Sequence, residues 1–377
     1  MKSKPKILFV VGQLYPGESG GVSISLYWLL KGLYASGNVQ LKTITTTYCI
    51  KKGLVPENKW INTDYGDVIY LTTSFIFFAP EMIRHFCKEV RKTDIVHLSS
   101  IFYPPSLICF LISFFYGKKV VWSTRGSVDD VEFQKKGGLK KIILLLLRIF
   151  IGKTIFHTTS QAETEFVKKR FGSSIKIVQI TNYVALPTPK KVSKEAFLLY
   201  IGRFHSKKGI ENLLYALTKS SYFNHSSFTL KIAGDYENEY GKTIFELHKE
   251  LHLQSKVTFL GAVTGEEKQN LLAKAYCMFM PSYSENFGVV AAEALAQYTP
   301  VVASIYTPWE ILNTYQAGFW IDNSPEKLAE VIDNLITMPT EDYERLVSKT
   351  RELVDKELNV YTNIQPWLNA YISFRNV

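Results

Sequence analysis

The first half of the chain alternates short apolar runs with longer segments that have helical periodicity. The short runs are typical of buried strands and lie at 7–11, 41–46, 68–71, 95–98, 120–123, 154–158 and 177–181. Between them, segments such as 22–35 and 162–171 repeat their apolar residues with the period of a helix. Strands that alternate with helices in this way predict a doubly wound parallel sheet.

A second alternation follows a linker. Residues 185–194 are rich in proline and lysine and have no periodicity, which is typical of a connection between domains. Apolar runs return at 197–201, 228–233, 257–260, 277–280 and 301–303, and helical patterns at 210–217 and 325–335. We therefore expect an α/β protein of two Rossmann-like domains, residues 1–187 and 188–359, that face each other across a cleft.

The net charge and the cysteine spacing limit which classes of binding partner and which redox environment we expect. The formal net charge of +10 over 377 residues favours phosphate-bearing ligands or an anionic surface. The charge is dispersed and no nucleic-acid-binding motif is present, so we expect no nucleic acid partner. The cysteines (Cys49, Cys87, Cys109 and Cys277) lie far apart, without the paired spacing of zinc or redox sites, which fits a reduced cytoplasm.

No apolar run is long enough to cross a membrane. The runs at 106–116 and 142–151 fall short of a spanning helix. Residues 1–12 lack the long apolar region and the cleavage site of a signal peptide, and they predict a first strand that enters a glycine-rich loop.

Candidate chemistry centres on the stretch 277–294, where an apolar run, a polar turn and a helical pattern follow one another. The first N–H groups of a helix are unpaired and attract anions, and here they belong to Asn286, Phe287, Gly288 and Val289. Two carboxylates, Glu285 and Glu293, lie before and inside the helix. A carboxylate here also has a simpler explanation, because it favours the helix dipole by about 0.3–1 kcal/mol.

Two further loops follow predicted strands. Arg203 and Lys208 come directly after the run 197–201, and a guanidinium with an ammonium suits a diphosphate; solvated surface charges are the alternative. In the first half, the glycines of 12–21, with Gly20 and Gly21 at the start of a helix, suit a phosphate or a sugar hydroxyl. This loop lacks the spacing of a dinucleotide fingerprint.

These motifs together resemble the group 1 retaining glycosyltransferases of the GT-B fold, the EX7E enzymes also called glycosyltransferase family four. The resemblance rests on Gly202-Arg203 with Lys208-Gly209, Ala233-Gly234-Asp235, Phe259-Leu-Gly261, Pro281-Ser282 with Glu285-Asn-Phe-Gly288 and Glu293, and Thr299-Pro-Val-Val302. Thr307-Pro-Trp-Glu310 and Gly318-Phe-Trp320 resemble a branch that builds bacterial surface polysaccharides.

The resemblance implies a UDP- or GDP-sugar donor held mainly by the second domain, and no cofactor. Glu285 would contact the transferred sugar and Glu293 the ribose, while Arg203 and Lys208 would neutralise the leaving diphosphate. The remaining donor-binding residues it implies are Gly20, Gly21, Gly261, Asn286, Phe287, Gly288 and Val289. The edge formed by residues 259–262 would read the base by main-chain contacts. With cations and a helix terminus on the phosphate, and no Asp-x-Asp pair in the sequence, no metal is expected.

The implied activity is a hexosyltransferase that acts on a glycan or a polyprenyl-diphosphate-linked glycan in lipopolysaccharide, capsule or exopolysaccharide synthesis. Two other classes stay open: a nucleotide-sugar epimerase or hydrolase of the same architecture, and a non-catalytic sugar-nucleotide-binding protein. Retention of configuration, with the leaving phosphate accepting the acceptor's proton, is likewise implied only by the resemblance. The family's last helix crosses back to the first domain, so we expect residues 360–377 to pack there.

The sequence departs from the family at one turn. Many members carry a histidine after the fifth strand of the first domain, whereas this chain has Arg125 in Ser123-Thr-Arg-Gly126. An arginine cannot act as a base near neutral pH, but it can bind donor or acceptor oxygens. His97 ends a predicted strand, and we weigh an acceptor contact against a packed, hydrogen-bonded histidine.

Residues 134–148 combine lysines with a very apolar helical segment. Such a helix can rest on an anionic membrane surface, which would place a cytoplasmic protein on the inner face of the plasma membrane. Burial as a core helix explains the same pattern equally well, because the segment is apolar on every side.

Overall fold

The computed structural model describes residues 3–17, 21–73, 75–130, 133, 137–185, 187–190 and 192–376. The chain divides into two compact units. Unit 1 comprises Met1–Ala185 and Val360–Val377, and unit 2 comprises Leu186–Asn359. The boundary expected after residue 187 lies beside this division, and the C-terminal segment belongs to unit 1.

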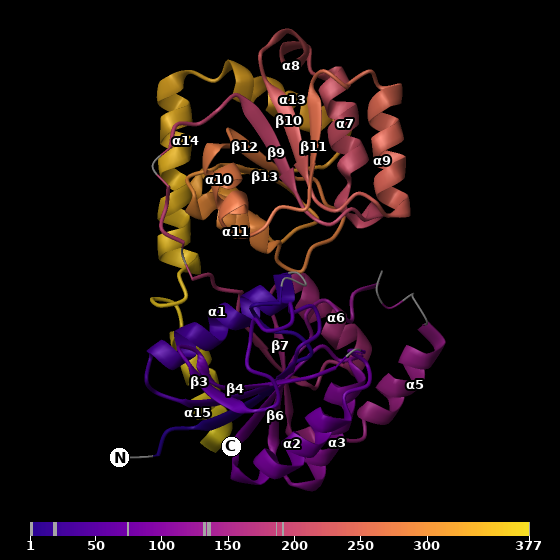
Figure 1. The fold of residues 1–377 in the computed structure, drawn as a ribbon, viewed down its shortest axis with the longest axis vertical. Coiled ribbons are helices and arrows are strands. Elements are labelled where there is room, and N and C mark those ends of the chain that lie inside the picture. The colour runs from indigo at the N-terminus through magenta and orange to yellow at the C-terminus, as the bar shows by residue number, and fades with distance from the viewer. Residues whose placement is uncertain are drawn as a thin grey trace. The chain divides into compact units, whose positions relative to one another are not determined.

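Unit 1 is built on an eight-stranded sheet with the order β3-β4-β2-β1-β5-β6-β7-β8 (Figure 1). Its strands are β1 (Lys6–Val10), β2 (Gln40–Thr46), β3 (Trp60–Thr63), β4 (Gly66–Leu71), β5 (Ile95–Ser99), β6 (Lys119–Ser123), β7 (Thr154–Thr158) and β8 (Lys176–Gln179). All neighbours are parallel except β3 and β4, which are antiparallel. The predicted doubly wound sheet is confirmed.

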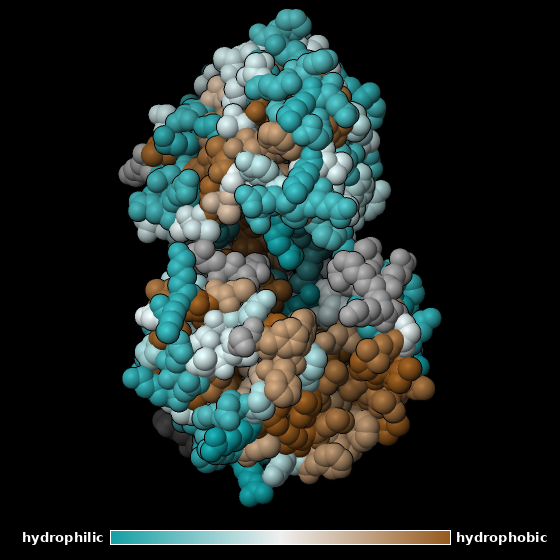
Figure 2. Space-filling view, turned by 45° about the vertical axis from the view of Figure 1, so that its right-hand side comes forward, coloured by the Kyte–Doolittle hydropathy of each residue, from teal (hydrophilic) through white to brown (hydrophobic). Residues whose placement is uncertain are grey.

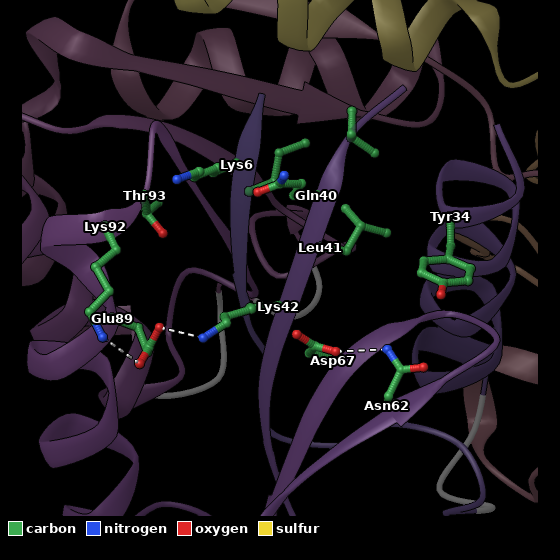
Figure 3. A pocket seen from close by; sticks show the side chains of 12 residues that line it. Lys6, Tyr34, Gln40, Leu41, Lys42, Asn62, Asp67, Glu89, Lys92 and Thr93 are labelled. Atoms are coloured by element: carbon green, nitrogen blue, oxygen red, sulfur yellow. Dashed lines mark hydrogen bonds and ion pairs between the residues drawn. The ribbon is translucent and has the colours of Figure 1, made fainter. Parts of the chain in front are cut away.

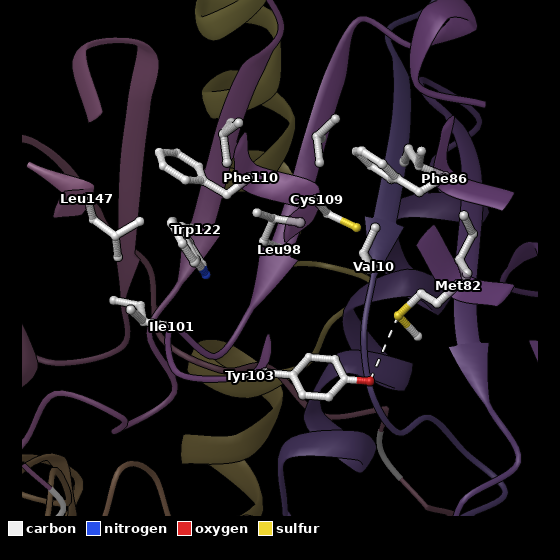
Figure 4. Packing of buried hydrophobic residues seen from close by; sticks show 14 of the residues in the cluster. Val10, Met82, Phe86, Leu98, Ile101, Tyr103, Cys109, Phe110, Trp122 and Leu147 are labelled. Carbon is white, nitrogen blue, oxygen red and sulfur yellow. Dashed lines mark hydrogen bonds between the residues drawn. The ribbon is translucent and has the colours of Figure 1, made fainter. Parts of the chain in front are cut away.

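Helices cover both faces of this sheet because its strands are apolar on both sides. In β1, Leu8 and Val10 pack in one hydrophobic cluster, while Ile7 and Phe9 pack in another. This alternation follows from the pleat of a strand, and Figure 4 shows the cluster around Val10 and Trp122. The helices of unit 1 are α1 (Gly21–Ala35), α2 (Pro80–Glu89), α3 (Pro104–Phe115), α5 (Gly137–Leu147), α6 (Gln161–Phe171) and α15 (Gln365–Asn376).

The C-terminal helix α15 packs on the face that carries Phe9. Its residues Trp367 and Tyr371 are buried in the same cluster as Phe9, together with residues of α1. These aromatic side chains hold the helix there, because each of them buries a large apolar area.

Unit 2 contains a six-stranded parallel sheet with the order β11-β10-β9-β12-β13-β14. Its strands are β9 (Phe197–Ile201), β10 (Thr229–Ala233), β11 (Val257–Gly261), β12 (Cys277–Met280), β13 (Val301–Ser304) and β14 (Gly318–Ile321). Its helices are α7 (Ile210–Lys219), α8 (Ser221–His225), α9 (Glu239–Glu250), α10 (Gly265–Lys274), α11 (Val289–Ala296), α12 (Ile311–Tyr315), α13 (Pro325–Thr337) and α14 (Thr340–Leu353).

The order of strands in unit 2 reverses between β9 and β12. The chain runs outward from β9 through β10 and β11 on one side, and from β12 through β13 and β14 on the other. The chain therefore leaves the neighbouring strands β9 and β12 in opposite directions along the sheet. In open α/β sheets this switch point, at the carboxyl ends of the strands, is where ligands bind.

Within the described residues, no helix is both long enough and apolar enough to cross a membrane. The four cysteines are free thiols, as their spacing predicts: Cys49 and Cys87 are exposed, and Cys109 and Cys277 are buried.

Candidate functional site

The loops that follow β9 and β12 pack tightly against each other at the switch point. The Tyr283 amide donates to the carbonyl oxygen of Lys207 over 2.7 Å. Gly209 has φ +62°, and a Cβ atom there would lie 2.3 Å from the carbonyl oxygen of Pro281. Only a glycine permits this approach, so the two predicted donor-binding loops form one structure.

This packing brings Lys208 and Glu285 into contact. The Lys208 ammonium, at the end of the 3₁₀ turn Ser206–Lys208, forms an ion pair with Oε1 of Glu285. The Ser282 hydroxyl donates to the same oxygen over 3.1 Å. The Lys208 and Glu285 side chains are only 19% and 14% exposed. A pair this withdrawn from water interacts more strongly than a surface pair.

Arg203 lies in the same neighbourhood but is exposed. Its carbonyl oxygen accepts a hydrogen bond from the buried Tyr200 hydroxyl over 3.3 Å. Burial raises the pKa of Tyr200 well above its ordinary value; the nearby Glu285 carboxylate raises it further, and Arg203 opposes the shift. The Tyr200 hydroxyl therefore lies close enough to interact with the charges of both Glu285 and Arg203. In the described part of the chain the Arg203 guanidinium has no ion-pair or hydrogen-bond partner, so it is available to a ligand.

The start of α11 supplies further hydrogen-bond donors. Gly288 precedes the helix with φ +76°, and a Cβ atom there would lie 2.6 Å from the Met280 sulfur. Trp309 donates its Nε1–H to the carbonyl oxygen of Phe287, whose side chain is buried against the indole. Among the described residues, none accepts a hydrogen bond from the amides of Phe287, Gly288 and Val289. They are the open donors expected of a helix N-terminus. Asn286 lies half-buried in the turn before them.

Glu293 has a partner that the sequence did not indicate. Its Oε1 accepts from the Lys268 ammonium of α10 over 2.8 Å. Burial raises the pKa of the Glu293 carboxyl, and the Lys268 charge opposes that rise. The two residues lie on different helices, so no spacing rule could have paired them.

Two asparagines brace the loop after β12, and sequence reasoning missed both. Asn323 donates to the carbonyl oxygen of Pro281 over 2.8 Å. Asn212 donates to the Tyr283 hydroxyl over 2.8 Å and to the carbonyl oxygen of Asn323 over 2.9 Å. Asparagine side chains in loops are too common to be singled out without the fold.

Gly261, predicted to lie at the base-binding edge, ends β11 with φ +73° and open space where a Cβ would stand. Its carbonyl oxygen accepts from the Gly234 amide over 2.7 Å. The strand end is therefore fixed by the neighbouring loop, and among the described residues no atom beyond the chain neighbours lies within 4 Å of the Cβ position.

His97 of unit 1 is fully buried and both of its ring nitrogens are engaged. The Ile180 carbonyl oxygen can only accept, so the neutral His157 donates from Nε2 over 2.9 Å and accepts at Nδ1 from Ser123 over 2.8 Å. Ser123 accepts in turn from Nε2 of His97 over 2.7 Å, and Tyr371 donates to Nδ1 over 2.6 Å. The pKa of His97 is lowered well below its usual value, chiefly by burial. Of the two alternatives, His97 is therefore the packed, hydrogen-bonded histidine, and neither ring nitrogen is left to contact a sugar acceptor.

Arg125 is buried as well, at φ +52°. Its Nη1 donates to Asn182 over 2.7 Å and to Ser25 over 3.4 Å, while Nε and Nη2 have no hydrogen-bond partner among the residues that the structure describes. Burial lowers the pKa of Arg125. Of the two glycines expected to reach the donor, Gly21 is the first residue of α1, and Gly20 lies outside the described residues.

A cavity of about 390 Å³ in unit 1 holds none of the predicted site residues (Figure 3). It lies where β1 and β2 begin, lined by residues such as Lys6 and Gln40. Three of its charged residues pair with one another, since Glu89 contacts Lys42 over 2.7 Å and Lys92 over 3.5 Å. The amino ends of parallel strands are also not where such sheets bind ligands. Among the described residues, no group of three or more His, Cys, Asp or Glu could hold a metal ion.

Comparison with known proteins identifies a family for part of the chain. Residues 187–353 match the family described as "Glycosyl transferases group 1". The O-antigen chain mannosyltransferase RfbU of Salmonella typhimurium is 32% identical over 150 residues, which cover 40% of this chain and 41% of RfbU. The first relatives found are matched over only 36% to 41% of their own length.

Solved structures are similar over almost the whole chain. Sucrose-phosphate synthase from Thermosynechococcus elongatus has a TM-score of 0.76 at 19% identity, covering 98% of this chain and 99% of that one. HepE from Anabaena, in complex with UDP-glucose, has a TM-score of 0.73 at 18% identity, covering 98% and 99%. Likeness at such low identity establishes the fold. The chain is built on the GT-B fold, and its residues 187–353 form a group 1 glycosyltransferase domain.

Proposed function

We propose that the protein is a retaining hexosyltransferase. It takes a hexose-type sugar from a UDP- or GDP-sugar and transfers it to a glycan or a polyprenyl-diphosphate-linked glycan during synthesis of bacterial surface polysaccharide. The observation that carries the proposal is the contact of Lys208 with Glu285 at the switch point of unit 2. The similarity to RfbU, named as an O-antigen mannosyltransferase, and to HepE, solved with UDP-glucose, supports the classes of donor and acceptor.

The charges at the site suit a transfer in which a sugar cation separates from a diphosphate. Arg203, Lys208 and the open amides at the start of α11 form the positive end, which stabilises the leaving group. Glu285 forms the negative end, next to the charge that develops on the sugar ring. These cations supply the neutralisation that a divalent metal gives in other transferases, so the proposed reaction needs no metal.

The ion pair also suggests how the donor is accepted. Before binding, Lys208 and Glu285 satisfy each other. A diphosphate carries more charge than one carboxylate and competes for the ammonium. The Glu285 carboxylate is then released toward the sugar.

Retention requires that the new bond forms on the face from which the phosphate leaves. In the proposed step, the bond from the anomeric carbon to the phosphate oxygen breaks, and a bond from that carbon to the acceptor oxygen forms. The acceptor's proton passes to the departing phosphate. The role of the protein is to hold the phosphate close enough to receive it, which the cations and the helix terminus do.

The test is a panel of nucleoside diphosphates and nucleotide sugars in thermal unfolding, followed by transfer assays with the donor that binds. A ligand at about one hundred times its dissociation constant adds about 2.7 kcal/mol to stability. We expect one nucleoside diphosphate to raise the unfolding temperature and its sugar conjugate to support transfer. A protein that binds no member of the panel would contradict the proposal.

We also propose that unit 1 rests on an anionic membrane surface. The helices α3 and α5 expose the apolar residues Ile108, Leu111, Phe114, Phe115, Leu139, Ile142, Leu145, Leu146 and, just beyond α5, Ile149. The rings of Phe114 and Phe150 meet at 5.0 Å, so the two segments lie side by side, and Figure 2 shows a broad hydrophobic area on unit 1. We call these nine residues the apolar surface.

Burial as a core helix does not account for the pattern of α5. Leu144 and Leu147 are buried, whereas Leu145 is 64% exposed and Ile149 is 71% exposed. Soluble monomers rarely expose so large an apolar area without a partner. The exposed Lys141 and Arg148 flank it, and cations beside apolar side chains suit a bilayer with anionic headgroups.

Vesicle sedimentation tests this proposal. We expect the protein to bind vesicles containing phosphatidylglycerol at low salt, and to bind neutral vesicles less. The variant Ile142→Ser/Leu145→Ser should lose this binding, whereas Tyr222→Ser, which changes an exposed aromatic residue of unit 2, should keep it. A wild-type protein that ignores anionic vesicles at low salt would rule the proposal out.

A further inference from the structure

The ion pair between Lys268 and Glu293 has properties that a purely structural pair would not need. The two side chains are 17% and 7% exposed, so both charges are largely removed from water. A buried ion pair seldom adds net stability over a packed apolar pair. Oε2 of Glu293 and the remaining N–H donors of Lys268 have no partner among the described residues.

The position of the pair relates it to the donor site. Glu293 lies on α11, whose first turn presents the open amides of Phe287, Gly288 and Val289. Lys268 lies on α10, the helix that follows Gly261 and the open space at the end of β11. The two helices pack against each other. The pair therefore joins the segment that faces a phosphate to the segment beside which a base would lie.

The chemistry of the free atoms is complementary to two adjacent hydroxyl groups. A carboxylate oxygen accepts from one hydroxyl, and an ammonium N–H donates to the oxygen of its neighbour. The Lys268 charge also opposes the burial that raises the pKa of Glu293, and so favours the ionised carboxylate, which accepts hydrogen bonds at both oxygens. A neutral residue at position 268 would provide neither effect.

We propose that Lys268 is a specificity-determining residue of the donor site, which holds Glu293 through Oε1 and, with the free Oε2, recognises the two hydroxyls of the donor's ribose. This inference rests on the proposed function, because it assumes a nucleoside diphosphate as the ligand. It adds a cation to the ribose contact and predicts strong discrimination against deoxyribose.

The experiment is calorimetric titration of the full chain with UDP, GDP and their 2′-deoxy counterparts. Wild-type protein should prefer the ribose form of the diphosphate that it binds by roughly tenfold or more, since hydrogen bonds to charged groups contribute on that scale. Lys268→Met should weaken ribose binding roughly tenfold and change deoxyribose binding little. Lys268→Arg should keep part of the preference. Lys274→Met, on the same helix but paired with Glu195 over 2.9 Å, is the matched control and should behave as wild type.

The outcomes separate the inference from the proposed function. Wild-type protein that binds neither diphosphate refutes the donor class itself. Wild-type binding with an unchanged ribose preference in Lys268→Met refutes the role of Lys268 alone, as does an equal loss for both sugars. If Lys268→Met does not fold, the variant Lys268→Met/Glu293→Gln removes both charges together. It should fold and show the same loss of preference, and an intact preference in it would overturn the inference.

Discussion

The ammonium of Lys208 and the carboxylate of Glu285 form an ion pair although the two residues are 77 positions apart in the sequence. They meet because β9 and β12 are neighbours at the point where the strand order of unit 2 reverses. The cation proposed for the leaving group and the anion proposed for the sugar are thereby held together in the structure.

Replacing Glu285 tests the anionic end of the site. We expect Glu285→Gln to lower the rate of transfer by about 10²–10³-fold, the usual effect of removing one group that stabilises transition-state charge. Nucleoside diphosphate affinity should not fall, because the carboxylate is assigned to the sugar and competes with the diphosphate for Lys208. Rates from donor turnover and affinities from calorimetry distinguish the two effects. Glu246→Gln, which alters an exposed ion pair of α9, is the control and should leave both unchanged.

The two cations should respond differently to removal. Lys208→Met leaves the largely buried Glu285 carboxylate without its ammonium, and breaking such a pair costs about 3–5 kcal/mol when it is fully buried. We therefore expect a loss of stability, of which a second change, Glu285→Gln, restores part. Chemical denaturation of the single and double variants provides the measurement. Equal stability of wild type and Lys208→Met would show that the pair is too solvated to matter.

Arg203→Met should separate binding from stability. The guanidinium is exposed and has no partner in the described part of the chain, so its loss should change the free energy of unfolding by less than about 0.5 kcal/mol. Affinity for a nucleoside diphosphate should fall about tenfold or more, because a charge-assisted hydrogen bond is lost. Unchanged affinity would remove Arg203 from the diphosphate site.

The sequence predicted the central strands and the site loops because both depend on local signals. Buried strands such as β9 and β12 are continuous apolar runs, and the polar turn before Gly288 predicts the start of a helix. The edge strands β3 and β14 were missed. They are short and only partly buried, so their residues lack the apolar pattern that marks an interior strand.

The partners of the predicted residues could not be predicted, because they come from distant parts of the chain. Lys268 reaches Glu293 across two helices, and Tyr371 reaches His97 from 274 positions away. The burial of Arg125 was equally unforeseen, since an arginine after a strand is usually solvated. Such pairings depend on how elements pack, which periodicity does not encode.

Acid should loosen the attachment of α15. The pKa of His157 is lowered to about 3, chiefly by burial, and that of His97 is lowered well below 6.5. Both are neutral when folded, so an unfolded chain binds more protons below its ordinary histidine pKa of about 6.5. The contribution of the two neutral histidines to the free energy of unfolding is therefore fully present above about pH 6.5. It falls as the pH drops below it, by up to about 1.4 kcal/mol per pH unit for each histidine.

Amide hydrogen exchange of the Gln365–Asn376 segment between pH 7 and 5, corrected for intrinsic exchange rates, measures this effect. His157→Gln keeps a donor for the Ile180 carbonyl and an acceptor for Ser123 but cannot titrate, so it should reduce the pH dependence to the part that His97 contributes. A slope that is the same in this variant would assign the acid sensitivity to other groups.

Gly209 should be the least replaceable glycine in the two loops that follow β9 and β12. A Cβ there would lie 2.3 Å from the Pro281 carbonyl oxygen, at φ +62°. Gly37 has nearly the same backbone, φ +66°, with no atom within 4 Å of a Cβ. Gly37→Ala therefore measures the cost of the left-handed backbone alone, about 1–2 kcal/mol. Gly209→Ala adds the clash, which must push the loop after β12 away and carry Glu285 with it. We expect greater destabilisation and a loss of transfer only in Gly209→Ala. If both variants lose the same stability and keep full transfer, the close approach of the two loops is not what holds Lys208 against Glu285.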